Sequence, residues 1–201
     1  MTNIAVADIA NADVTSIIAE ATKELNSMIN VRVIRERVDY IDTTRENLIN
    51  GSNTTFYVKN WRGKFLADMN NDGSVSIADV EVIYRDTDGT ETSATVSSVD
   101  AGIGQFVMET APSSGYEVYV TYEWAYRNPD TPDPLIKLAC TLLSAAYCYA
   151  KINWGRAPQV AFGNTRFFRH MEAFDMYYKR FLQAVSLINN RRASYKDGKS
   201  F

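Results

Sequence analysis

A run of oxygen-bearing side chains at residues 68–79 has the spacing of a calcium-binding loop. Its sequence, DMNNDGSVSIAD, puts oxygen donors at positions 1, 3, 5 and 12 and glycine at position 6. Calcium takes roughly six to eight oxygen ligands. The candidate ligands are the side chains of Asp68, Asn70, Asp72 and Asp79 and the main-chain carbonyl of Ser74. The spacing therefore predicts a bound Ca²⁺ ion, and the competing interpretation is a turn whose Asp and Asn side chains bond their own main chain.

The same run resembles the calcium loops of dockerin modules, which also end in Asp where an EF-hand loop ends in Glu. The segment that follows, Val80–Tyr84, has the β-branched composition of a strand, whereas dockerins continue as a helix. Dockerins also carry the loop in duplicate, and this sequence has one copy. The resemblance implies a calcium-dependent protein-binding module, which we keep as the alternative function.

No set of residues with catalytic spacing accompanies the loop. The single histidine, His170, follows Arg169 in a predicted helix, where a surface position is expected. Cys140 and Cys148 are eight residues apart in another predicted helix, about 12 Å along its axis, which is too far for a disulfide. The glycines of Gly102–Gly104 belong to a hairpin turn and not to a phosphate-binding loop. The sequence therefore predicts a protein without enzymatic activity.

Composition narrows the class of protein further. With 201 residues, 46% of them hydrophobic, the chain can bury a core without disulfides or metals. A net charge of -3 gives no general attraction to nucleic acid or to acidic membranes. We find no run of about 18 apolar residues that would span a bilayer, and Met1–Ala5 lacks the features of an export signal. We expect an intracellular protein that makes no membrane contact.

Three helices are predicted, at residues 13–29, from Pro134 through about 153, and at 165–190. Asp13 is expected to cap the first helix, and Asp133 the second, with Pro134 at its first position. The second helix is apolar on nearly every side. Such a helix lies centrally among its neighbours or against another subunit.

The segment between the first two helices is rich in strand signals. The run Val31–Asp42 is β-branched with alternating charges and predicts an exposed strand or arm. Six short strands follow, separated by Asp, Asn, Gly and Pro turns that favour a small barrel or sandwich. The expected strands are Thr55–Lys59, Lys64–Ala67, Val80–Arg85, Thr90–Ser97, Gln105–Glu109 and Tyr116–Trp124.

These elements predict an α+β fold, a small bundle of about three helices with an inserted antiparallel barrel-like or sandwich-like domain. We assign residues 1–53 and 126–190 to the helical core and residues 54–125 to the β insert. The Pro-rich stretch 126–134 marks the second boundary.

Residues 191–201 are expected to form an extended tail that is disordered in the free subunit. The tail is polar and aperiodic, and ordering it would cost roughly 1–2 kcal/mol per residue. Its cationic and aromatic side chains suit a partner surface with a polar rim. The candidate partner-binding residues are Arg191, Arg192, Tyr195, Lys196, Lys199 and Phe201.

Three features together resemble the head–tail adaptor (connector) proteins of tailed bacterial and archaeal viruses. They are the apolar helix DPLIKLACTLLSAAYCYAKI at Asp133–Ile152, the hairpin series at Val80–Trp124, and the basic C-terminal tail. The resemblance implies a structural virion protein that forms a dodecameric ring, made in the host cytoplasm and located in the virion neck. Its implied partners are other copies of the chain, the portal protein and a neck or tail-completion protein. The lumen of such a ring is a passage for DNA.

Overall fold

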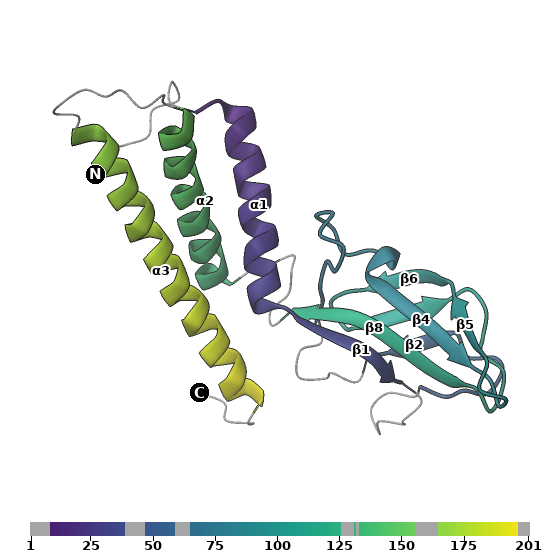
Figure 1. The fold of residues 1–201 in the computed structure, drawn as a ribbon. Helices are drawn as coiled ribbons and strands as arrows, with labels where there is room; N and C mark the ends of the chain where they lie inside the picture. The colour runs from purple at the N-terminus through teal and green to yellow at the C-terminus, as the bar shows by residue number, and fades with distance from the viewer. Residues whose placement is uncertain are drawn as a thin grey trace. The chain divides into compact units, whose positions relative to one another are not determined.

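The computed structural model describes residues 9–38, 47–58, 65–125, 131, 133–155 and 165–196 (Figure 1). These residues form an α+β protein with three α-helices and antiparallel sheets. The chain divides into a helical unit, Met1–Ile29 with Pro132–Phe201, and a β unit, Asn30–Thr131. The β unit is therefore larger than the segment 54–125 expected from the sequence.

The helical unit consists of α1 (Asn11–Ile29), α2 (Pro134–Gly155) and α3 (Thr165–Lys196). Helix α2 lies between α1 and α3 (Figure 1). All three contribute to one buried core, whose members are Ala21, Leu25, Ile29, Ala139, Leu143, Phe181, Ala184, Val185 and Ile188. A second small cluster joins the N-terminal half of α1 to the C-terminal half of α2 through Ile17, Cys148 and Ile152, so these two helices run antiparallel.

The two predicted helix caps have different outcomes. Asp133 does cap α2, because its Oδ1 accepts a hydrogen bond of 2.8 Å from the N–H of Leu135. The predicted cap at Asp13 is wrong, since α1 begins two residues earlier, at Asn11. Inside the helix, Asp13 instead forms an ion pair of 2.7 Å with Lys151 of α2.

Helix α3 is longer than predicted and continues through Lys196. The predicted start of an irregular tail at residue 191 is therefore wrong. Arg191–Lys196 contains no Gly or Pro, and its residue types tolerate a helix. The first helix-ending residue after Ile188, the last core residue of α3, is Gly198.

Helix α2 also corrects one expectation about composition. Its Pro134–Ile152 stretch, with a mean hydropathy of 1.4, is long and apolar enough to cross a membrane by length and composition alone. The prediction that no segment reaches this length and apolarity is therefore wrong. A core helix of a globular protein passes the same test, and α2 contributes Ala139 and Leu143 to the helical core.

The β unit contains two antiparallel sheets. The five-stranded sheet has the order β1-β8-β4-β5, with β3 pairing with one end of β8, and the three-stranded sheet has the order β2-β7-β6. The strands are β1 (Val31–Arg37), β2 (Thr55–Tyr57), β3 (Phe65–Leu66), β4 (Val80–Arg85), β5 (Glu91–Ala94), β6 (Val96–Asp100), β7 (Gln105–Met108) and β8 (Glu117–Ala125). The predicted arm after α1 is thus a strand of the larger sheet. Among the described strands no closed barrel forms.

One hydrophobic core is shared by the two sheets. The predicted alternation along β8 is confirmed, because Val118, Val120, Tyr122 and Trp124 are all buried. From the other sheet, Phe56 of β2 and Phe106 of β7 stack with ring centroids 5.9 Å apart. The rest of the core comes from Val38, Val58, Leu66, Val80, Val82, Val96 and Met108.

Strand β1 contains a bulge that sets which side chains face this core. Val33 pairs with Tyr122 and Glu36 with Val120, so Ile34 and Arg35 together oppose Thr121. Arg35 has a φ of 55°, and its N–H donates to Thr121 Oγ1 at 3.1 Å. Because of the extra residue, Val31, Val33 and Val38 all face the core while Arg35 and Arg37 lie on the opposite face.

A buried asparagine that the sequence did not single out lies beside β2. Asn47 is 3% exposed. Its side-chain amide donates to the carbonyl of Tyr57 and accepts from the N–H of Tyr57, both at 2.8 Å. The side chain thus bonds to strand β2 as a neighbouring strand would.

Candidate functional site

The Asp68–Asp79 loop connects β3 to β4 and ends in a short 3₁₀ helix, Ile77–Asp79. Asp79 is 1% exposed. Its Oδ1 accepts from the N–H groups of Met69 at 2.7 Å and Asn70 at 3.0 Å, and its Oδ2 accepts from Ser76 at 2.7 Å. The last residue of the loop therefore fixes the first turn of the loop through main-chain hydrogen bonds.

The other predicted ligands turn toward the same main chain. Asp68 accepts from the N–H of Asp72 at 3.1 Å and of Gly73 at 2.7 Å. Asn70 Oδ1 also accepts from the Asp72 N–H, at 2.9 Å, and Asp72 Oδ1 accepts from the Ser74 N–H at 3.0 Å. Gly73 has a φ of 104°, which only glycine adopts without strain. The structure thus brings the predicted residues into one compact loop.

These bonds leave both predicted interpretations of the loop in place. A carboxylate has about four acceptor sites, so Asp68, which accepts two hydrogen bonds, can still offer oxygen to a cation. Asp79 accepts four hydrogen bonds, from Met69, Asn70 and Ser76, and would have to give up some of them to bind calcium. No three His, Cys, Asp or Glu side chains in the described residues are grouped so that they could hold a metal ion. A cation at this loop would therefore also need the Asn70 amide oxygen and main-chain oxygens. Calcium binding stays a prediction.

Glu123 of β8 adds a further carboxylate near this end of the β unit. Partial burial raises its pKa, and the charges of Asp68 and Asp79 raise the pKa further, while Arg32 lowers it. The main-chain carbonyl of Glu123 accepts from the Ala67 N–H at 2.9 Å, next to the start of the loop. Negative charge is thus concentrated where the loop meets the sheet.

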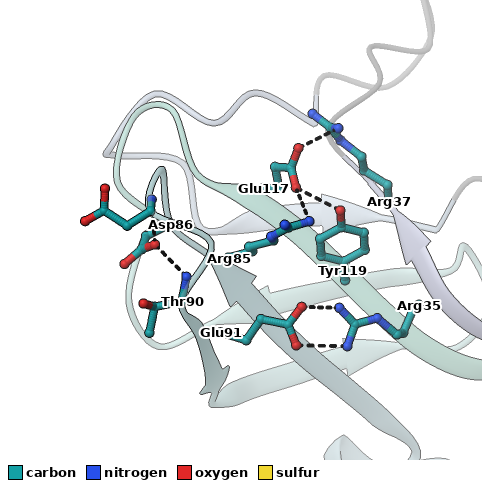
Figure 2. Close-up of polar contacts among 9 residues, drawn as sticks. Arg35, Arg37, Arg85, Asp86, Thr90, Glu91, Glu117 and Tyr119 are labelled. Carbon is teal, nitrogen blue, oxygen red and sulfur yellow. Dashed lines mark hydrogen bonds and ion pairs between the residues drawn. The ribbon is translucent and has the colours of Figure 1, made fainter.

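A second polar cluster covers the outer face of the five-stranded sheet (Figure 2). Arg35 of β1 extends to Glu91 of β5, with one contact of 3.0 Å between Nη1 and Oε2. Its guanidinium carbon lies 5.0 Å from the ring centroid of Tyr119. The hydrogen bond between the two side chains raises the pKa of Arg35 and lowers the pKa of Glu91. The pair connects the two edge strands across β8 and β4.

Glu117 of β8 is the centre of the second group in this cluster. Its carboxylate lies 2.7 Å from Arg37 Nη1 and 3.6 Å from Arg85 Nη1, and it accepts from the Tyr119 hydroxyl at 2.8 Å (Figure 2). The sequence did not reveal the ion pairs of Glu117, because they depend on the register of β1 and β4 against β8. Ion pairs exposed to solvent in this way each contribute about 0–1 kcal/mol to stability.

The remaining residues singled out in the sequence lie in the helical unit. Arg191, Arg192, Tyr195 and Lys196 lie in the last turns of α3, where Arg191 is exposed, while Lys199 and Phe201 lie outside the described residues. His170 lies in α3. Cys140 Sγ lies 3.4 Å from Thr22 Oγ1, and burial raises the pKa of the Cys148 thiol, which disfavours a reactive thiolate.

Apolar side chains on the outside of the helical unit form a third feature of the chain. Only 33% of the apolar Pro134–Ile152 stretch is buried. Large hydrophobic side chains are exposed on all three helices: Ile18, Leu138, Met176, Leu182 and Leu187, at 46%, 50%, 39%, 44% and 54%. Exposed apolar side chains mark a surface that binds another protein or a membrane only where they form one contiguous patch.

Comparison of the chain with protein-family models, curated proteins and solved structures finds no match.

Proposed function

We propose that this chain is a structural virion protein, a head–tail adaptor whose copies form a ring between the portal and the neck or tail-completion protein. The observation that carries this proposal is the incomplete burial of α2. The helix is apolar on nearly every side, yet only 33% of its apolar stretch is fully buried within the chain, and Leu138 is half exposed. Neighbouring copies of the chain would cover the rest.

Burial of the exposed apolar side chains against another copy of the chain would be favourable in free energy. Exposed apolar surface costs about 25 cal/mol for each Å² that could have been removed from water. Leu138 of α2 and Leu182 of α3 are each about half exposed, at 50% and 44%. The core of an interface between subunits is more apolar than the rest of the surface and would remove such side chains from water. A helical unit with exposed leucines suits a subunit that functions only within an assembly.

The proposal includes the finer architecture and the partners. The three helices act as a small bundle that forms the ring, and the two sheets act as a sandwich-like domain displayed by it. The ring is dodecameric by resemblance, lies in the virion neck and passes DNA through its lumen. The basic end of α3, from Arg191 to Lys196, together with Lys199 and Phe201, contacts the portal or neck protein.

Light scattering after size-exclusion chromatography, with and without a calcium chelator, tests the ring. We expect a large closed oligomer that survives the chelator. Leu138→Glu should reduce the oligomer to the monomer, because it places charge on the exposed apolar surface. Lys137→Glu, at the adjacent exposed position, is the matched control and should leave the oligomer intact. A chain that is monomeric in every condition, including after co-expression with the portal protein, would contradict the proposal.

Truncation after Asn190 tests the role of the C-terminal residues. The core of α3 ends at Ile188, so the shortened chain should keep its fold and melting temperature. It should no longer attach to portal-bearing capsids. Attachment of the truncated chain at the wild-type level would show that these residues do not bind the partner.

The second candidate function is a calcium-dependent binding module of the dockerin type. The geometry that favours it is the Asp68–Asp79 loop, with Gly73 at φ 104° and Asp79 closing the first turn. This function predicts a monomer whose affinity for its partner collapses when calcium is chelated, which is the opposite outcome in the chelator experiment.

A further inference from the structure

The two edge strands of the five-stranded sheet are matched to one another. Strands β1 and β5 end the path β1-β8-β4-β5, and no described strand pairs with their outer edges. Every neighbouring pair on this path is antiparallel, so β1 and β5 run in opposite directions. When copies are placed side by side in the same orientation, β1 of one therefore meets β5 of the next in the antiparallel sense.

The main-chain hydrogen-bonding groups of the two edges also match. The Val38 N–H donates to the Val118 carbonyl, and the Glu123 carbonyl accepts from Ala67 on the other side of β8. Residues along an antiparallel strand alternate between the two neighbours. Since Arg32 pairs with Glu123, the main-chain groups of Arg32 point to the open edge.

The same alternation applies to β5. The Asp86 N–H donates to the Thr90 carbonyl at the hairpin, and the pairs Arg85–Glu91 and Ile83–Ser93 follow. The main-chain groups of Glu91 and Ser93 therefore point away from β4. The side chains of Glu91 and Arg32 both lie on the outer face of the sheet, opposite the core. Paired residues in an antiparallel ladder lie on the same face of the sheet. If β1 of one copy pairs with β5 of another, the core-facing sides of both sheets therefore lie on the same side of the joined sheet.

Charge and exposure agree with this geometry. Strand β1 carries Arg32, Arg35, Glu36 and Arg37, and β5 begins with Glu91 directly after a turn that contains Asp86 and Asp88. Arg35 and Arg37 are paired with Glu91 and Glu117 inside the subunit, so Arg32 is the β1 cation that can meet the neighbour. Ile34, at the bulge of β1, is 70% exposed, more than any other large hydrophobic side chain in the described residues. Arg32 and the exposed Ile34 thus lie on one edge of the sheet, and the acidic turn before β5 lies on the other edge.

We propose that β1 of one copy pairs with β5 of the neighbouring copy, so that the five-stranded sheets of adjacent subunits form a continuous belt. This inference rests on the proposed ring and names the surface that joins its β units. Head-to-tail contacts of this kind close into a ring when the rotation between copies divides a full turn. Pairing would bring Arg32 opposite Glu91 or Ser93 of the neighbour and would shield Ile34 from water.

Disulfide cross-linking tests the contact in the full-length chain. In a Cys140→Ser, Cys148→Ala background, Arg32→Cys is combined with Ser93→Cys or, for the other register, with Glu91→Cys. Directly opposed residues in such a ladder have Cα atoms about 5.5 Å apart, within the range for a disulfide. Oxidation should give a ladder of covalent oligomers on a non-reducing gel. Arg32→Cys with Glu81→Cys is the matched control, because Glu81 is exposed on the central strand β4.

The outcomes separate this inference from the proposed function. Cross-linked ladders with either edge pair and none with the control support the belt. A ring seen by light scattering without edge cross-links, or with equal cross-linking of the control, overturns the belt and leaves the adaptor proposal standing. A chain that stays monomeric contradicts both.

Discussion

Asp72 and Asp79 belong to the same loop but make very different contacts. Asp79 is buried and accepts hydrogen bonds from three main-chain N–H groups, whereas Asp72 is at the exposed turn and accepts mainly from Ser74. Asp79→Ala should therefore destabilise the β unit by at least about 1–3 kcal/mol, the cost of leaving one buried donor unpaired. Chemical denaturation measures this loss.

Asp72→Ala separates calcium binding from folding. The substitution removes a predicted ligand together with hydrogen bonds from Ser74 and Asn70 that are exposed to solvent, so the melting temperature without calcium should fall less than in Asp79→Ala. If the loop binds calcium, calorimetric titration of the wild-type chain shows one site, and the variant binds at least tenfold more weakly. Absence of both heat and thermal shift in the wild-type chain would identify the loop as an ordinary turn.

The Arg35–Glu91 pair predicts a pH-dependent contribution to stability. The hydrogen bond with Arg35 lowers the pKa of Glu91 in the folded chain below its unfolded value of about 4.3. The ionised pair therefore stabilises the fold above that value, and the contribution disappears as the pH falls through the folded pKa. Glu91→Gln should melt slightly below the wild-type chain at pH 7, and the difference should shrink as the pH falls below about 4.3. A difference that is constant with pH would contradict this assignment.

Single residues could be predicted from the sequence where the signal is local. The Asp, Asn and Gly spacing of residues 68–79 predicted a compact loop with a turn at Gly73, and the structure contains both. The Arg35–Glu91 pair joins residues 56 positions apart, and Asn47 bonds to a strand ten positions later. Neither can be read from local pattern, because both depend on tertiary placement.

At the scale of elements, the β1 bulge predicts that one residue is dispensable. Deletion of Ile34 would leave Arg35 opposite Thr121 and keep the pairs Val33–Tyr122 and Glu36–Val120. Strand β1 would become regular with its inward side chains unchanged. We expect the variant to fold with a change in free energy of unfolding within about 1 kcal/mol, measured by urea denaturation.

Deletion of Arg37 is the matched control for the bulge. If Val38 stays paired with Val118, the bulge is lost and Arg35 lies opposite Val120. The Arg35 side chain then faces the core. Burying a guanidinium without a partner costs several kcal/mol, in the range of about 3–5 for a broken buried pair. Equal stability of the two deletion variants would show that the bulge does not determine which β1 side chains face the core.

Element types followed from the sequence more readily than element ends and partners. Five of the six strands expected within residues 54–125 have one counterpart each, since β-branched runs between turn residues are a local signal. The prediction of one strand at Thr90–Ser97 is wrong, because the structure divides it between β5 and β6, which belong to different sheets. Pairing of β1 with β8, about 85 residues away in sequence, is a long-range contact and was not anticipated. The end of α3 was placed too early because the polarity of Arg191–Lys196 resembles that of a tail.

For the whole molecule, the division into two units predicts that the β unit can be removed. Both hydrophobic clusters of the helical unit contain only residues of that unit. Helix α1 ends and α2 begins at the same end of the unit (Figure 1). Joining Ile29 to Asp133 through a short Gly/Ser linker should leave the helices folded. Loss of the helical circular dichroism signal in this variant would show that the β unit is needed for the helical core.

The α+β class and the apolar character of α2 were both predictable from composition and periodicity. The boundary at residue 54 was placed too late, because the sequence does not reveal that β1 is part of the larger sheet. The assembly partner could not be predicted from one sequence either. Exposed leucines suggest that another surface packs against them, but they do not identify that surface.

The proposed adaptor ring is tested most directly by the mass of the assembled species. The chain is purified alone and after co-expression with the portal protein of the same virus, and native mass is measured in both. We predict a closed ring, about 270 kDa for a dodecamer of the 22.6-kDa chain, alone or bound to the portal. A species that keeps the mass of one chain in both preparations would contradict the account.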